Sequence, residues 1–246
     1  MDFNYARTML AEETADRVLN IKRSFSSALE LGANQGECSR SLRFMNAILI
    51  ENTKYLSSNV MSYLVQTDSC PYVTYKADTP KFHVDKNAVD ESQALPYKDN
   101  SFDLVISNLN LHWVNDLDKS CREILRVLKP DGAFVGAIWG NDSLYELRQS
   151  IQLAEMERRG GVVPRVGPLT RGDSFSSVLH GAGFKLITCD YWEEQYGYPT
   201  IFELVEDLQN SGESQCAFNF RPLHPDILMS AAAIYQVRVA HLKFHC

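Results

Sequence analysis

The stretch Ser27–Gly36, "SALELGANQG", combines a short apolar run, an acidic residue and a loop that carries glycine at both ends. This order predicts a buried strand, a tight turn and the start of a helix, which is how α/β folds build a nucleotide-binding cradle. Gly32 and Gly36 permit the left-handed backbone of such a turn, and Asn34 is among the residues that tolerate it best after glycine. The same pattern also suits a turn that binds no ligand, so the loop alone leaves both interpretations open.

Strand-like and helix-like segments alternate along the rest of the chain. Strands are predicted over residues 27–32, 47–51, 81–89 (in competition with 72–78), 102–111 and 133–139. Helices are predicted over residues 1–21, 37–45, 54–66, 116–132, 142–161, 174–182, 198–210 and 224–237. This alternation predicts an α/β fold with a doubly wound, mostly parallel sheet that helices cover on both faces. We expect a single domain over residues 1–246, with a cofactor-binding core over about 20–140 and partner- or substrate-side helices and late strands over about 141–246.

The composition excludes several classes of function. With 246 residues, 45% of them hydrophobic and 22% charged, the chain suits one large globular domain. A net charge of −7 argues against nucleic acid as a partner, because phosphate neutralisation needs a basic surface. The six cysteines include no C-x-x-C pair, a pattern that favours reduced thiols over a zinc site. No apolar run is long enough to span a membrane, and no targeting presequence is visible.

The residues around the fourth predicted strand carry a family resemblance. The segment "LPYKDNSFDLV", residues 95–105, is similar to a phrase that is widespread in class I S-adenosylmethionine-dependent methyltransferases. Narrower motifs are "SNLNLHWVNDL" at 107–117, "LKPDGAFVGAIWGNDSLYELRQSIQLAEMERRGG" at 128–161, "FELVEDLQNSGESQCAFN" at 202–219 and "DILMSAAAIY" at 226–235. They resemble the methyltransferase-like assembly factors of mitochondrial respiratory complex I, the NADH dehydrogenase (ubiquinone) assembly factor 5 family. The resemblance runs from about Tyr5 to Tyr235.

This resemblance implies a function and a location. It implies a class I methyltransferase fold, of Rossmann-like type, that binds S-adenosylmethionine and hydroxylates an arginine in a matrix-arm subunit of complex I. The implied partners are that subunit and other assembly factors, and the implied location is mitochondrial, peripheral to the matrix side of the inner membrane. Two alternatives stay open: a methyltransferase acting on a protein or carrier-bound carboxylate, as in the related biotin-pathway enzyme, and a non-catalytic assembly chaperone.

The glycine motif of the family falls on Glu30, Gly32 and Gly36, with Asn34 where the family has glycine. We therefore expect these four residues to contact the cofactor. The sequence departs from the family after Tyr235, where "QVRVAHLKFHC" replaces the expected closing strand. This departure predicts that the last strand is missing or altered.

Three acidic residues are candidates for the nucleoside. Glu51 ends the strand predicted over 47–51, about twenty residues after the glycine loop, where a carboxylate can accept from ribose hydroxyls. A gapless match to the family places Ile48 at the usual aspartate, which leaves Glu51 as its substitute. Asp90 and Glu91 precede Leu95, where the family offers an acid to the adenine amine. The alternatives are an exposed helix-entry residue and a solvated acidic loop.

Asn108, His112 and Trp113 follow the fourth predicted strand and are the candidate catalytic residues. His112 could act as a base near neutral pH, and Trp113 could form a wall of the pocket or face a cation. The alternative is that both complete the core. The H-x-D pairs at 83–85 and 224–226 match the spacing of iron ligands, but six histidines make such pairs common by chance, and we predict no metal site.

Overall fold

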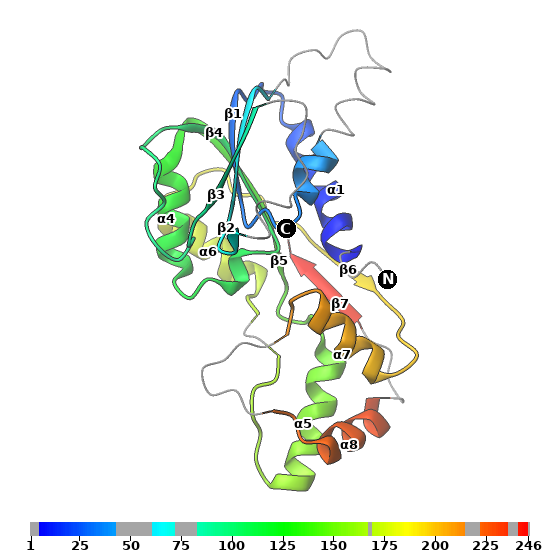
Figure 1. The fold of residues 1–246 in the computed structure, drawn as a ribbon. Coiled ribbons are helices and arrows are strands. Elements are labelled where there is room, and N and C mark those ends of the chain that lie inside the picture. Colours follow the sequence, from blue (N-terminus) through cyan, green and yellow to red (C-terminus); the bar gives the residue numbers. More distant parts are fainter. Residues whose placement is uncertain are drawn as a thin grey trace. The chain divides into compact units, whose positions relative to one another are not determined.

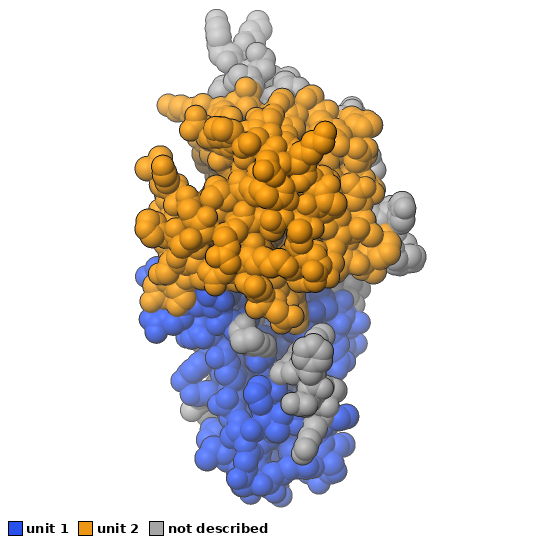
Figure 2. All heavy atoms as spheres, turned by 90° about the vertical axis from the view of Figure 1, so that its left-hand side faces the viewer, with its two compact units in different colours: residues 1–4, 139–172, 190–245 blue, residues 5–138, 173–189, 246 orange. Residues whose placement is uncertain are grey.

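The computed structural model describes residues 5–42, 61–71, 83–166, 169–214, 222–235 and 241–245. Two compact units divide the chain, and Figure 2 colours them separately. The first, which we call the sheet unit, comprises Tyr5–Ile138 and Asp173–Cys189. The second, the late unit, comprises Trp139–Gly172 and Asp190–His245. The single-domain organisation expected from the sequence stays a prediction.

Five parallel strands form the centre of the sheet unit, in the order β3-β2-β1-β4-β5. They are β1 (Ser27–Leu31), β2 (Tyr63–Asp68), β3 (His83–Ala88), β4 (Phe102–Asn108) and β5 (Leu128–Trp139). The chain moves outward from β1 to β3 and returns to β4 on the other side of β1. The strand order therefore reverses between β1 and β4, and ligands of such sheets bind beyond the carboxyl ends of the strands at this point. The predicted α/β fold is confirmed.

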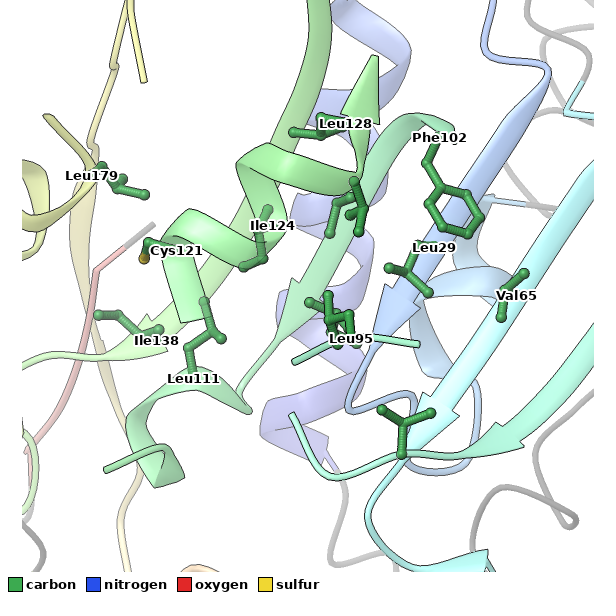
Figure 3. Packing of buried hydrophobic residues seen from close by; sticks show 14 of the residues in the cluster. Leu29, Val65, Leu95, Phe102, Leu111, Cys121, Ile124, Leu128, Ile138 and Leu179 are labelled. Carbon is green, nitrogen blue, oxygen red and sulfur yellow. The ribbon is translucent and has the colours of Figure 1, made fainter. Parts of the chain in front are cut away.

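Helices cover both faces of this sheet because successive strand residues point to opposite sides. On one face, α1 (Tyr5–Asn20) packs Ala11, Ala15 and Val18 against a cluster that includes Ala28, Leu64, Leu104 and Ile106. On the other face lie α4 (Leu117–Val127) and α6 (Gly172–Ala182). Figures 1 and 3 show this second layer, in which Leu29 and Val65 belong to the same cluster as Cys121 and Ile124 of α4.

A buried carboxylate joins three strands at the amino end of the sheet. Asp103, the second residue of β4, accepts hydrogen bonds from Ser26 Oγ (2.6 Å), Ser27 N (3.1 Å) and Lys129 Nζ (3.1 Å). Burial acts to raise the pKa of Asp103, but the hydrogen bonds from Ser26, Lys129 and Ser27 outweigh it and hold the pKa well below its ordinary value. Asp103 therefore stays ionised and holds the starts of β1, β4 and β5 together.

The described residues of the late unit form three helices and an antiparallel strand pair. They are α5 (Tyr145–Arg159), α7 (Ile201–Asn210), α8 (Pro225–Tyr235), β6 (Tyr191–Gln195) and β7 (His241–His245). Helix α5 ends as predicted at a glycine, because Gly160 adopts a left-handed backbone (φ 65°) that closes the helix. The departure from the family after Tyr235 does not remove the last strand, since β7 pairs with β6 throughout its length.

One predicted element is wrong in a way that affects the site. The helix predicted over residues 54–66 cannot extend to its end, because Tyr63–Asp68 form the strand β2 beside β1. Leu64 and Val65 belong to a short apolar run, which periodicity alone does not distinguish from the end of a helix. The strand predicted over 47–51 lies outside the described residues. Within the ranges that the structure describes, no helix is long and apolar enough to cross a membrane.

Candidate cofactor site

The turn after β1 has the backbone that its sequence predicts. Gly32 (φ 63°), Asn34 (φ 46°) and Gly36 (φ 78°) all lie in the left-handed region. Gly36 N donates to Ala33 O (2.7 Å), and residues 37–42 continue as a helix. The asparagine therefore replaces a glycine without breaking the turn, because its short polar side chain tolerates this conformation.

Glu30 lies beneath this turn in a fully enclosed position, with 2% of its surface exposed. Its Oε2 accepts from Gln66 Nε2 (3.1 Å), which also donates to Ser39 Oγ (2.9 Å) at the start of the helix after the turn. Burial raises the pKa of Glu30 to about 7, although the Gln66 hydrogen bond acts to lower it. The contacts of Glu30 are thus with β2 and the following helix, and its predicted role at the cofactor stays a prediction.

Asp68 is the acidic residue that ends β2. It is not among the site residues predicted from the sequence. The register pairs Leu31 with Thr67, so Asp68 lies level with Gly32 at the carboxyl edge. Its Oδ2 accepts from Asn34 N (3.1 Å), its Oδ1 accepts from Cys70 N (2.9 Å), and the residue is partly exposed. A carboxylate at this point can accept from ribose hydroxyls.

The predicted ribose acid, Glu51, lies outside the described residues, so the structure does not place it. Its assignment depended on a second strand over 47–51, whereas the strand beside β1 is β2. The signal that could have identified Asp68 is the segment "YLVQTD", an apolar run that ends in an acid as "SALE" does. The prediction of Glu51 follows instead from the spacing of about twenty residues expected in dinucleotide-binding folds, and it stays a prediction.

Asp90 and Glu91 separate after β3 although they are neighbours in the chain. Glu91 is buried, with 7% of its surface exposed, and its Oε1 accepts from Gly32 N (2.9 Å). Asp90 faces outward and its Oδ1 accepts from Ser92 N (3.0 Å) and Ser92 Oγ (2.6 Å), which lower its pKa. Of the two candidates for the adenine amine, only Glu91 contacts the glycine turn.

The carboxyl end of β4 supplies the predicted catalytic residues. Asn108 Nδ2 donates to Arg7 O (3.0 Å), and Arg7 Nη1 donates to Leu109 O (3.2 Å), so this end of β4 is tied to α1. His112 and Trp113 lie on the short helix η1 (Leu111–Trp113) with their ring centroids 5.3 Å apart, and 37% of Trp113 is exposed. Asn108 thus has a structural contact, and the catalytic roles of all three stay predictions.

Asn110, between β4 and η1, is likewise absent from the site residues predicted from the sequence. An added Cβ at Gly32 would lie 2.1 Å from Asn110 Cγ and 2.5 Å from its Oδ1, so the amide covers the turn directly. Thr67 completes the group: its Oγ1 donates to Glu30 O (3.1 Å) and lies 3.4 Å from Glu91 Oε1. Side chains that follow β3 and β4 therefore contact Gly32, and Thr67 of β2 contacts one of them, Glu91.

In each of the two H-x-D pairs the histidine lies beside its own aspartate. His83 Nε2 lies 3.2 Å from Asp85 Oδ1, and His224 Nδ1 lies 3.3 Å from Asp226 Oδ2. Over the ranges that the structure covers, no three His, Cys, Asp or Glu side chains come together as metal ligands.

The donor and acceptor set at this edge fits a sulfonium nucleoside. Asp68 offers oxygens for ribose hydroxyls, Glu91 offers one for an exocyclic amine, and Gly32 has no side chain to hold a ligand away from the backbone. All three lie in the sheet unit at the switch point between β1 and β4.

Comparison with known proteins agrees with this description. The family model for the methyltransferase domain matches residues 50–136. Among solved structures, the [4+2]-cyclase SpnF superposes with a TM-score of 0.56 at 17% identity, covering 97% of this chain and 80% of its own. The superposition shows the predicted fold, and the matched methyltransferase domain supports the predicted class of protein and the predicted cofactor, S-adenosylmethionine.

Two curated relatives identify the family more narrowly. The mitochondrial arginine-hydroxylase NDUFAF5 of Homo sapiens is 42% identical over 95% of this chain and 64% of its own length. The protein of the same name from Danio rerio is 40% identical over 95% of this chain and 68% of its own length. The chain therefore belongs to the NDUFAF5 family, and it spans less than two thirds of the human relative.

Proposed function

We propose that this protein binds S-adenosylmethionine at the carboxyl edge of β1, β2 and β4 and acts in mitochondria in the assembly of respiratory complex I, by hydroxylating an arginine of a matrix-arm subunit. The observation that carries the binding proposal is the convergence of Asp68, Glu91 and the left-handed turn at Gly32. The names of the human and Danio rerio relatives support the hydroxylase activity and the mitochondrial location.

The residues of this edge would divide the work of binding. Asp68 would accept from the ribose hydroxyls, and Glu91 would accept from the adenine amine. The backbone at Gly32 would contact the part of the cofactor that carries the sulfonium. The bound cofactor would supply a positively charged sulfonium with an activated methyl group. His112 and Trp113, at the end of β4, would face the substrate side, where His112 could hold a proton and Trp113 could pack on a guanidinium.

Hydroxylation places further demands on the reaction. It converts an arginine C–H bond into C–OH, and with dioxygen as the oxygen source it consumes two electrons and two protons to form one water. We propose that the target arginine, other assembly factors and the electron donor meet this protein on the matrix side of the inner membrane. No step of oxygen activation is assigned to a residue of the chain.

A Gly32→Val variant tests the cofactor site. A side chain here meets Asn110 at 2.1–2.5 Å and is strained at φ 63°, so we expect loss of S-adenosylmethionine binding by calorimetry. Gly161→Val is the matched control, because nothing lies within 4 Å of its added Cβ. Circular dichroism establishes whether both variants fold. Unchanged affinity in a folded Gly32→Val protein would contradict the proposed site.

The matched methyltransferase domain favours a second candidate, methyl transfer to a protein or to a carrier-bound carboxylate. Mass spectrometry of complex I subunits from cells with and without this protein distinguishes the two. A subunit that gains one oxygen supports hydroxylation, and one that gains a methylene supports methyl transfer. A protein that binds no S-adenosylmethionine and changes no subunit would be an assembly chaperone.

A further inference from the structure

Two side chains from different loops lie against Gly32 and cover the turn that a cofactor must approach. Glu91, after β3, accepts from the Gly32 N–H at 2.9 Å. Asn110, after β4, fills the space on the Cβ side of the same residue. The turn at Gly32 is therefore covered by two side chains of the protein: Glu91 on the N–H of Gly32 and Asn110 on its Cβ side.

The length of Glu91 makes its contact possible. The main chain of Glu91 is fixed, because Ser120 Oγ of α4 donates to Glu91 O (3.0 Å). From this position a carboxylate one methylene shorter would end about 1.5 Å nearer its own backbone, too far from Gly32 N for a hydrogen bond.

The contact has a cost that suggests a second position for Glu91. Burial raises the pKa of Glu91, and the neighbouring Asn110 amide and the hydrogen bond from Gly32 N offset that effect only in part. The charge of Asp68 also acts to raise it. The charged form of Glu91 is therefore more stable in a position where it accepts from a donor of the ligand and lies farther from Asp68.

We propose that Glu91 and Asn110 form a latch over Gly32 that must open before the cofactor binds. This inference rests on the proposed cofactor site, which it extends by naming the residues that control access. In the closed state Glu91 bonds to Gly32 N–H; in the open state it leaves Gly32 and accepts from the adenine amine, while Asn110 turns from the glycine. The measured dissociation constant then exceeds the intrinsic one by the reciprocal of the open fraction.

Shortening either side chain should open the latch. Glu91→Asp keeps a carboxylate for the adenine amine but cannot reach Gly32, and Asn110→Ser removes the covering amide. We expect each variant to bind S-adenosylmethionine roughly three- to tenfold more tightly in calorimetry, as loss of one charge-assisted contact allows. Glu12→Asp and Asn20→Ser, exposed on α1, are matched controls and should bind as the parent does.

A measurement without ligand tests the latch independently of the cofactor. Amide hydrogen exchange at Gly32, followed by NMR, should be about tenfold faster in Glu91→Asp than in the parent. Glu91→Gln retains the length of the side chain and an acceptor oxygen, so its Gly32 amide should stay protected. Thermal unfolding identifies any variant that does not fold.

The outcomes separate the latch from the proposed function. Faster Gly32 exchange together with tighter binding supports the latch. Unchanged exchange in a folded Glu91→Asp protein overturns it, as does weaker binding of the cofactor to that variant. Faster exchange in the absence of any binding by any variant, the parent included, supports the latch as a closed contact and contradicts the proposed cofactor.

Discussion

Four carboxylates of the sheet unit show how position decides the role of one chemical group. Hydrogen-bond donors stabilise the ionised form of Asp103, and Glu30 is fully enclosed, with a pKa of about 7. Glu91 is buried against Gly32, whereas Asp68 is partly exposed at the edge. Only Asp68 is accessible enough to meet a ligand without moving first. Residue type alone does not distinguish these roles, because hydrogen-bond partners and burial set them.

Glu30 predicts a pH dependence of stability. Its folded pKa of about 7 exceeds its ordinary 4.5, so the stability from the protonated, buried form is complete below pH 4.5 and is lost as the pH rises through 7. We expect Glu30→Gln to gain about 3 kcal/mol in unfolding free energy relative to the parent between pH 4.5 and 8. Urea unfolding at both values measures this difference. A difference independent of pH would show that Glu30 is ionised in the folded protein throughout.

Asp68 predicts the strongest single effect on nucleoside binding. Replacement by Asn keeps the size of the side chain but removes the charge that, in the proposed binding mode, would accept from the ribose hydroxyls. We expect Asp68→Asn to weaken S-adenosylmethionine binding roughly tenfold or more, because a charge-assisted hydrogen bond is lost. Calorimetry provides the comparison, with the exposed Asp90→Asn variant alongside it to show whether the neighbouring loop also matters. An unchanged dissociation constant for Asp68→Asn would return attention to Glu51.

At the scale of elements, the sheet depends on its amino end. Asp103 joins the starts of β1, β4 and β5 by accepting from Ser26, Ser27 and Lys129 through one carboxylate. The opposite end of the same strands carries turns and loops instead. The elements are thus connected tightly at one end and through side chains of the site at the other.

Asp103→Asn should lower the unfolding free energy by about 2 kcal/mol or more, since the amide cannot satisfy three donors and Lys129 loses its counter-charge. Chemical denaturation at neutral pH measures the loss. Asp99→Asn, on an exposed side chain that pairs with Arg126, is the comparison and should cost less than 1 kcal/mol, roughly. Equal losses for the two variants would mean that Asp103 has no special structural role.

At the scale of the whole molecule, the net charge argues against nucleic acid as a partner. The chain has 24 basic and 31 acidic residues, a net charge of −7. Association with DNA or RNA depends on neutralising phosphates, so we expect no retention of either in a gel-shift assay at about 0.15 M salt. Binding that persists at this salt concentration would show a local basic surface that the net charge conceals.

The sequence was sufficient to predict the architecture and the backbone of the turn after β1. The alternation of segments predicts the parallel sheet, and the glycine spacing predicts the left-handed turn, because both depend on local preferences. Asp68 was not predicted, because β2 is short and its apolar residues fit a helix as well as a strand. Only the pairing with β1 shows that this segment is a strand. The position of Asn110 and the inward position of Glu91 could not be predicted from the sequence, because they depend on contacts between loops far apart in the chain.

The connection made by Asp103 has a consequence for how such a protein can change. Rigidity comes from one margin of the strands and recognition from the other. Substitutions that alter which small molecule is accepted therefore leave the foundation of the fold intact. We therefore expect a chain built this way to tolerate replacements of exposed residues along the carboxyl margin better than replacements around Asp103.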